Sequence, residues 1–303
     1  MGFGRETPAE RMFVASDKSE FRVRELVLGI EGLALLRNAI GTDEAFLERR
    51  LAEIRKYANG PAEDLPGGGA SVGELDAGAG YAAWSGIYDS LPSSYLEVEE
   101  PIVHRLFEEG PAGTALDAAC GTGRTTAALA ARGYRTIGVD QSPDMLEHAR
   151  RKVPDGEFHE GRLEKLPVDD ASVDLAVSTL ALTHMPDLTD AVAELARVVR
   201  PGGRVIVSDL HPFVVTLQGQ CLFVAGDEEL AFVRNHVHLA GDYLRAFTAA
   251  GLSVRACYEP LFNGRLAPGG YEEHISEAAR AAWNDIPIVI VWEAVKPAVG
   301  AAG

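Results

Sequence analysis

Apolar residues recur at helical spacing near the start of the chain. Over 23–34, and again over 47–58, they return every three or four residues, and Thr42 or Asp43 can cap the second helix. Two such amphipathic helices cannot bury their faces alone, so they must pack on each other, on the rest of the chain or on a second subunit. The apolar positions are Leu26, Val27, Ile30, Leu33 and Ala34 in the first helix and Leu47, Leu51, Ile54 and Ala58 in the second.

The pattern is lost between 59 and 80, where Gly, Pro and Ala dominate without an apolar period. Such a composition is typical of a flexible linker. We therefore divide the chain into an N-terminal helical extension over 1–60, a flexible linker over 61–80 and a main domain over 81–297.

Short β-rich runs alternate with helical segments from Thr114 onward. Helices are expected to begin near Gly123, at Ser142, which is followed by Pro143, and near Asp187. This alternation predicts a parallel sheet covered by helices on both faces, with a ligand at the carboxyl ends of the strands. The expected strands are 114–119, 134–140, 156–161, 173–178 and 203–209.

Composition and charge narrow the function. The 303 residues carry a net charge of −17, which disfavours nucleic acid and anionic membrane surfaces as partners. Cys120, Cys221 and Cys257 are too few and too far apart for a disulfide framework or a zinc cluster. With no long apolar run and a charged start that does not resemble a signal peptide, we expect a soluble cytoplasmic protein that binds no metal.

Two acids follow the first two strands of the main domain. Asp117 precedes a turn with Gly121 and Gly123, and an acid there suits a cationic ligand better than a pyrophosphate. Asp140 ends the second strand, where a carboxylate can accept both hydroxyls of a ribose. Together they predict a nucleoside ligand with a cationic tail.

Four segments in order, LDAACGTG (116–123), GVDQSPDML (138–146), LPVDDASVDLAVS (166–178) and RVVRPGGRVIVSD (197–209), resemble class I S-adenosylmethionine-dependent methyltransferases, particularly the ubiquinone/menaquinone-type small-molecule branch. The resemblance implies an α/β fold: a doubly wound, mostly parallel seven-stranded sheet, Rossmann-like, here with an N-terminal helical extension. Its last strand would run antiparallel, and its two final strands would be Leu252 to Tyr258 and Pro287 to Ala294.

The resemblance also implies a set of S-adenosylmethionine contacts. Ala119, Gly121 and Gly123 would face the methionine part and Asp117 its ammonium end, while Asp140 would hold the ribose. Gln141 and Met145 would flank the adenine, and Ser178 and Thr179 would line the passage to the sulfonium. Tyr88 would close over the cofactor, and Arg162 and Leu163 complete the set of contacts.

Two positions depart from the family pattern. Ala119 replaces the usual first glycine of the turn, which requires ordinary backbone angles there. Arg162 follows Gly161 where the family frequently has an Asp that accepts from the adenine amino group, and a guanidinium cannot accept a hydrogen bond.

Methyl transfer needs a base only when the acceptor must lose a proton. We rank His211, just beyond the fifth strand, first for that role and His184 second, although either could simply satisfy backbone groups. His236 and His238 lie in an expected substrate lid over about 210–250, without a convincing third metal ligand. Tyr81 and Trp84 would form the opposite wall of the substrate pocket.

The sequence thus predicts an S-adenosylmethionine-dependent methyltransferase acting on a small, partly apolar metabolite, with oxygen as the expected acceptor atom. The alternatives are methylation of carbon or nitrogen, a non-methylating enzyme such as a cyclase, a sensor with the same cofactor pocket, and a nicotinamide dehydrogenase. A homodimer formed through the N-terminal helices is the expected assembly.

Overall fold

A seven-stranded sheet forms the centre of the chain. The computed structural model describes residues 20–60, 70–84, 93–217, 219–224, 230–263 and 272–298. The sheet order is β10-β11-β7-β6-β3-β4-β5, and strands β7 to β5 are parallel. Among the described strands of this sheet, β11 alone runs in the opposite direction to the others, antiparallel to both β10 and β7. The strands are β3 (Thr114–Ala118), β4 (Arg135–Asp140), β5 (Glu157–Glu160), β6 (Val173–Thr179), β7 (Val199–Leu210), β10 (Ser253–Tyr258) and β11 (Val289–Val295).

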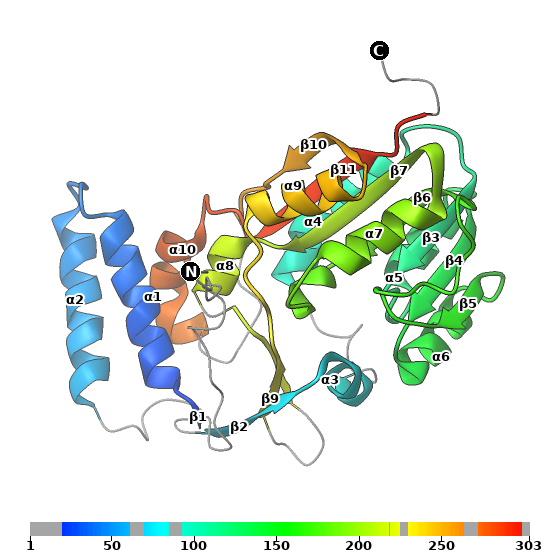
Figure 1. Ribbon diagram of the computed structural model, residues 1–303. Coiled ribbons are helices and arrows are strands. Elements are labelled where there is room, and N and C mark those ends of the chain that lie inside the picture. The colour runs from blue at the N-terminus through cyan, green and yellow to red at the C-terminus, as the bar shows by residue number, and fades with distance from the viewer. Residues whose placement is uncertain are drawn as a thin grey trace, which may run out of the picture.

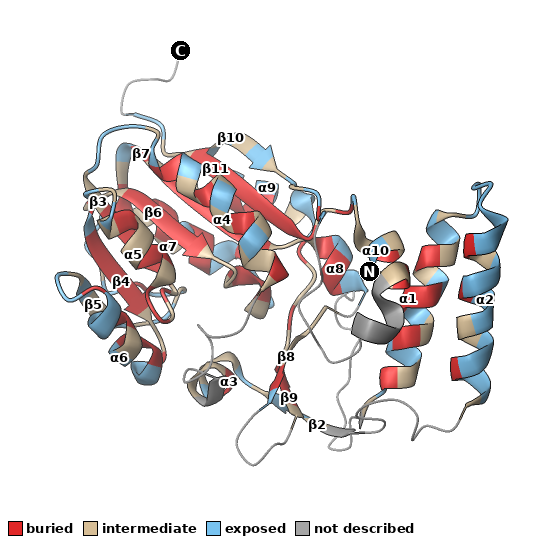
Figure 2. Ribbon diagram, turned by 180° about the vertical axis from the view of Figure 1, so that it is seen from behind, coloured by how far each residue is buried: buried red, intermediate tan, exposed pale blue. Residues whose placement is uncertain are grey.

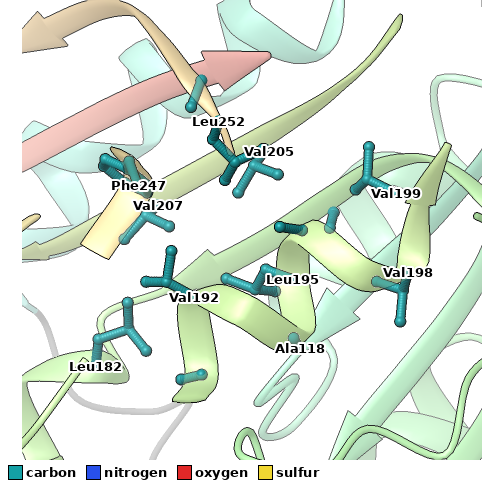
Figure 3. Packing of buried hydrophobic residues seen from close by; sticks show 14 of the residues in the cluster. Ala118, Leu182, Val192, Leu195, Val198, Val199, Val205, Val207, Phe247 and Leu252 are labelled. Atoms are coloured by element: carbon teal, nitrogen blue, oxygen red, sulfur yellow. The ribbon is translucent and has the colours of Figure 1, made fainter. Parts of the chain in front are cut away.

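Helices cover both faces of this sheet (Figure 1). Helices α7 (Thr189–Val198) and α9 (Ala240–Ala249) pack on one face, and α4 (Ser94–Phe107) and α5 (Arg124–Ala130) pack on the other. Helix α6 (Pro143–Lys152) lies beside α5 and β5, and short α8 (Pro212–Thr216) follows β7. Figure 3 shows how Leu195 of α7 and Phe247 of α9 meet the apolar side chains of the strands. The predicted doubly wound α/β fold is confirmed.

Local signals set the helix starts that face the ligand edge. The Ser142 hydroxyl accepts a hydrogen bond from the Met145 amide at 3.3 Å, with Pro143 in the first turn of α6. Gly123 caps α5 in the left-handed conformation, at a φ of 81°. Both helices therefore begin beside the carboxyl ends of β3 and β4, as predicted.

A second, four-stranded sheet has the order β1-β2-β9-β8. Its strands are β1 (Glu20–Phe21), β2 (Ala70–Leu75), β8 (Cys221–Val224) and β9 (Leu230–Val233), and β2 continues into α3 (Ala77–Trp84). The prediction of a flexible linker over 61–80 is therefore wrong for 70–80. Strand β2 gains its order from β9, a partner about 160 positions further along the chain.

The N-terminal helices α1 (Val23–Arg37) and α2 (Glu44–Asn59) pack with α10 (Glu272–Trp283), which lies between β10 and β11 in sequence. Val27, Ile30 and Phe46 meet Ala278 and Ala282 of α10 in one apolar cluster. The helical extension is thus part of a three-helix unit that includes a C-terminal segment of the chain. Figure 1 shows this unit beside the main sheet.

The buried face of α2 differs from the predicted one by one position. Phe46, Arg50 and Tyr57 are buried, whereas Leu51 is 40% exposed. In Figure 2 much of α2 is pale blue, the colour of exposed residues. Arg50 is buried because Nη1 donates to Glu31 at 3.1 Å and Nη2 donates to Glu277 at 2.8 Å. An ion-pair network across three helices therefore overrides the apolar period of α2.

Candidate active site

A cavity of about 720 Å³ opens at the carboxyl ends of β3, β4 and β6 and is closed on its other side by β2, α3 and β9. The small sheet therefore covers the ligand edge of the large one. Described residues from the predicted site line it: Tyr81, Ala119, Gly121, Asp140, Gln141, Met145, Arg162, Leu163, Thr179, His184 and His236.

The turn after β3 forms the floor of this cavity. Gly121 has a φ of 53°, and a Cβ built on it would meet no atom within 4 Å, so its missing side chain leaves room for a ligand. Gly123 is needed for packing, because a Cβ there would lie 3.0 Å from the Cα of Ala149. Gly123 does not itself line the cavity.

Ala119 adopts a φ of 62°, in the left-handed region. The expectation of ordinary backbone angles at this position is wrong. The turn keeps the geometry that a glycine would give it, and Ala119 holds that geometry against its own conformational preference.

Asp140 closes the turn from the neighbouring strand. Its Oδ2 accepts from the Gly121 amide at 2.8 Å and its Oδ1 accepts from the Ser142 amide at 2.9 Å. Burial raises the pKa of this carboxyl, and the backbone amides of Ser142, Gly121 and, to a smaller extent, Gln141 oppose that shift. Each oxygen has a second lone pair, so the carboxylate can still accept two hydroxyls.

Asp117 lies beneath the turn, fully buried, and does not line the cavity. Its Oδ2 accepts from the Thr126 hydroxyl at 2.6 Å, while its Oδ1 has no hydrogen-bond partner. Burial raises the pKa of Asp117 to about 6. A buried acid with one unsatisfied oxygen is a group that a bound cation near the turn would stabilise.

The predicted adenine end of the cavity is lined by Gln141, Met145, Arg162 and Leu163. Arg162 donates to Glu164 at 3.2 Å, and Glu164 also lines the cavity. A carboxylate is therefore present next to the position where the family pattern has its Asp.

At the end of β6, only one of two predicted residues reaches the cavity. Thr179 lines it and bonds Thr125 at 3.0 Å. Ser178 is fully buried and its hydroxyl has no partner, so the prediction that Ser178 lines the sulfonium passage is wrong. Alternation of side chains along a strand places neighbouring residues on opposite faces.

His184 stands in the short 3₁₀ helix η4 (Leu182–His184) after β6 and pairs with Tyr81 of α3. The Tyr81 hydroxyl lies 2.7 Å from His184 Nε2, and His184 Nδ1 lies 3.1 Å from the Arg234 carbonyl oxygen. A carbonyl can only accept, so Nδ1 carries the proton and Tyr81 donates to Nε2. Burial lowers the pKa of His184 to about 4, which keeps the ring neutral.

The other predicted histidines divide between the cavity and the scaffold. His236 lines the cavity, and burial lowers its pKa. His238 is buried outside it and lies 2.8 Å from the Met185 carbonyl oxygen through Nε2. His211 caps α8 by accepting from the Phe213 amide at 3.2 Å, and its Nε2 lies 3.0 Å from Glu259. His211 does not line the cavity, so its position does not support the first-ranked role predicted for it.

Two predicted aromatic residues are not placed at the site. Tyr88 lies outside the described residues. Trp84 ends α3, and its side chain lies outside the description as well.

Sequence reasoning missed several cavity residues. Arg124 directly follows the glycine turn, so the motif itself could have pointed to it. Glu74 and Arg234 come from β2 and the end of β9 and pair at 2.5 Å. No local signal marks them, because they meet only through the pairing of distant strands.

Comparisons with known proteins agree with this geometry. Residues 116–207 match the family model described as a methyltransferase domain. A malonyl-[acyl-carrier protein] O-methyltransferase of Serratia marcescens is 32% identical over 140 residues, 46% of this chain and 54% of the relative. A demethylmenaquinone methyltransferase of Chlorobaculum parvum is 42% identical over 89 residues, 29% of this chain and 37% of the relative. The chain thus spans about half the length, or less, of these curated relatives.

Solved structures support the same fold. An S-adenosylmethionine-dependent methyltransferase from Mesorhizobium loti aligns with a TM-score of 0.51 at 21% identity, over 65% of this chain and 97% of the other. The DhpI–SAH complex aligns with a TM-score of 0.53 at 20% identity, over 72% of this chain and 94% of the other. Among the helices that the structure describes, none is long and apolar enough to cross a bilayer. From the sheet order, the turn between β3 and α5 and the family match over 116–207, we conclude that the chain carries a methyltransferase domain with the fold of solved S-adenosylmethionine-dependent methyltransferases.

Proposed function

We propose that the protein transfers a methyl group from S-adenosylmethionine to an oxygen of a small, partly apolar molecule. The observation that carries this proposal is a pair of acids at the ends of β3 and β4, buried Asp117 and partly buried Asp140, beside a glycine turn that floors a cavity.

The residues present fit this cofactor. Asp140 has acceptor capacity for two ribose hydroxyls, and Gly121 leaves open space above the turn. The Oδ1 of Asp117, which has no hydrogen-bond partner, lies below the turn. The ammonium group of the cofactor would stabilise the negative charge of Asp117 by electrostatic attraction across the turn. Gln141, Met145 and Leu163 would flank the adenine, and Glu164 could accept from its amino group.

S-adenosylmethionine, when bound, supplies an activated methyl group on a positively charged sulfur. The protein then has to align the acceptor and exclude water. Thr179 lies at the end of β6, and α3 with the β2–β9 pair covers the cavity from the other side. This cover gives the cavity a wall that separates a bound acceptor from solvent.

A hydroxyl acceptor loses its proton as its oxygen forms the new C–O bond, and the electrons of the broken C–S bond remain on sulfur. Tyr81, held by its hydrogen bond to His184, lines the cavity and can accept a hydrogen bond from this hydroxyl, which orients its oxygen, while the proton itself leaves to water. The position of His184 fits a part in this step better than that of His211, which lies outside the cavity.

The proposal is tested by titrating the purified protein with S-adenosylmethionine in a calorimeter and by incubating it with methyl-labelled S-adenosylmethionine and a cell extract. Binding, together with one S-adenosylhomocysteine formed per labelled product, is the expected result. Binding without methylated product would indicate a sensor or a non-methylating enzyme, and absence of binding would overturn the proposal.

A further inference from the structure

The proposed function leaves the chemical class of the acceptor open, and the cavity wall opposite the glycine turn bears on it. Resting on that function, we propose that the acceptor subsite beside Tyr81 and His184 selects an uncharged compound that donates a hydrogen bond, such as a phenol or an alcohol, over a carboxylate.

The direction of one hydrogen-bond chain carries this proposal. The Arg234 carbonyl holds the proton on His184 Nδ1, so His184 Nε2 accepts the single proton of the Tyr81 hydroxyl. To every other group Tyr81 can then present only acceptor lone pairs. The O–H group of a methyl acceptor can donate a hydrogen bond to the Tyr81 oxygen. A carboxylate has no proton to donate and would place its lone pairs against those of the Tyr81 oxygen.

The chain keeps this direction because its Arg234 end is fixed and His184 stays neutral. The Arg234 carbonyl cannot donate, and the buried His184 ring, with its lowered pKa, does not take up a second proton at neutral pH. The Cys221 thiol also interacts with Tyr81, and a phenol oxygen has two lone pairs to offer.

The charges around the cavity lead to the same conclusion. Each of the three arginines that line it has a carboxylate partner among the described residues. Arg124 donates to Glu99 and Glu100, both at 3.1 Å. Arg162 donates to Glu164, and Arg234 donates to both oxygens of Glu74. A carboxylate ligand would have to compete with these pairs, because a guanidinium already neutralised by an acid attracts a second anion weakly.

The residues near His184 are mostly apolar, and Asp76, at the start of α3, adds a further negative charge to the wall. Leu180, Met185, Pro186 and Val233 line the cavity near His184, and burial lowers the pKa of His236, the other imidazole in the wall. Such a surface suits a flat apolar body, with Tyr81 as a polar contact that orients it.

Two probes with the same ring and the same substituted position test the proposal: 2-naphthol, a neutral donor, and 2-naphthoate, an anion. Each is titrated into the protein saturated with S-adenosylhomocysteine, and binding is followed by ligand-observed NMR. We expect 2-naphthol to bind at least tenfold more tightly. Equal binding, a preference for 2-naphthoate or no binding of 2-naphthol at millimolar concentration would overturn the proposal. Failure of S-adenosylhomocysteine itself to bind would instead refute the proposed function.

Variants separate the hydrogen bond from mere shape. Tyr81→Phe should weaken 2-naphthol about five- to tenfold, the loss of one neutral hydrogen bond, and leave 2-naphthoate and S-adenosylhomocysteine unchanged. Tyr258→Phe, a change of the same kind on β10 away from the cavity, is the control and should alter none of the three. Glu74→Gln removes the negative charge that faces the Arg234 guanidinium and should strengthen 2-naphthoate several-fold. If Tyr81→Phe weakened both probes equally, Tyr81 would contribute shape alone and the proposal would be wrong.

Discussion

Ala119 holds a backbone conformation that glycine adopts without strain. At a φ of 62°, its Cβ crowds the neighbouring carbonyl, which costs an L-residue about 1 kcal/mol relative to glycine. The conformation persists because the turn is tied to its surroundings: the Cys120 amide donates to the Val139 carbonyl, and the Gly121 amide donates to Asp140.

Ala119→Gly should therefore raise the free energy of unfolding by about 0.5 to 1 kcal/mol, offset in part by the greater freedom of glycine in the unfolded chain. Thermal unfolding measures the change. Ala118→Gly, at the buried end of β3, is the matched control and should lower stability, since its backbone is extended and its methyl is packed. A destabilised Ala119→Gly variant would contradict the strained turn.

His184 permits a prediction about pH. The folded pKa of about 4 lies below the ordinary value of 6.5, so the ring is neutral throughout the range from pH 5.5 to 8.5. The methyl-transfer rate at saturating S-adenosylmethionine should then show no inflection near pH 6.5 that is caused by His184. The pH profiles of wild type and of His184→Gln should therefore have the same shape in this range. A wild-type inflection there, absent from the variant, would mean that His184 titrates near neutrality and is less buried than described.

The residues that could be predicted from sequence are those whose roles follow from neighbours in the chain. Asp140 ends a strand and Gly121 stands in a turn, and both positions are local properties. The Tyr81–His184 pair joins residues 103 positions apart, so neither residue alone reveals it. Ser178 and Thr179 differ in exposure because of the strand's alternation, and an error of one residue in the register exchanges them.

At the scale of elements, the strands of the large sheet could be predicted because each is a short β-rich run between helix signals. Strand β2 could not, because its Gly- and Ala-containing sequence has little strand propensity and its order comes from pairing with β9. The buried face of α2 was displaced for a similar reason: Arg50 is buried only because Glu31 and Glu277 come from two other helices.

Arg50→Ala should destabilise the three-helix unit strongly. The change leaves Glu31, which is fully buried, without its cation, and losses of about 3 to 5 kcal/mol are typical when one partner of a buried pair is removed. Urea unfolding followed by circular dichroism measures the loss. Arg55→Ala, an exposed position on the same helix, is the control, and equal stability of the two variants would show that the network contributes little.

For the whole molecule, stability should depend on pH through Asp209. This carboxyl is fully buried in the core beside Tyr243, whose hydroxyl donates to it at 2.8 Å, and burial raises its pKa from 3.8 to about 7. A raised folded pKa means that its contribution to stability is complete below pH 4 and is lost as the pH rises through 7.

Asp209→Asn keeps the shape but cannot ionise, so it should be more stable than wild type at pH 8 and lose that advantage towards pH 4. The difference should amount to a few kcal/mol. Unfolding curves at several pH values measure it. A variant that is less stable than wild type at pH 8 would show that the charged carboxylate is the form the core favours.

The most direct measurement is calorimetric titration of the protein with S-adenosylhomocysteine, repeated on Asp140→Ala and on Asp155→Ala, an exposed acid nearby in sequence. If Asp140 holds the ribose hydroxyls and closes the turn, its removal should raise the dissociation constant at least tenfold, the loss of a charge-assisted contact, and Asp155→Ala should bind like wild type. Equal affinities for all three proteins, or no binding by wild type, would contradict a cofactor site at the ends of β3 and β4.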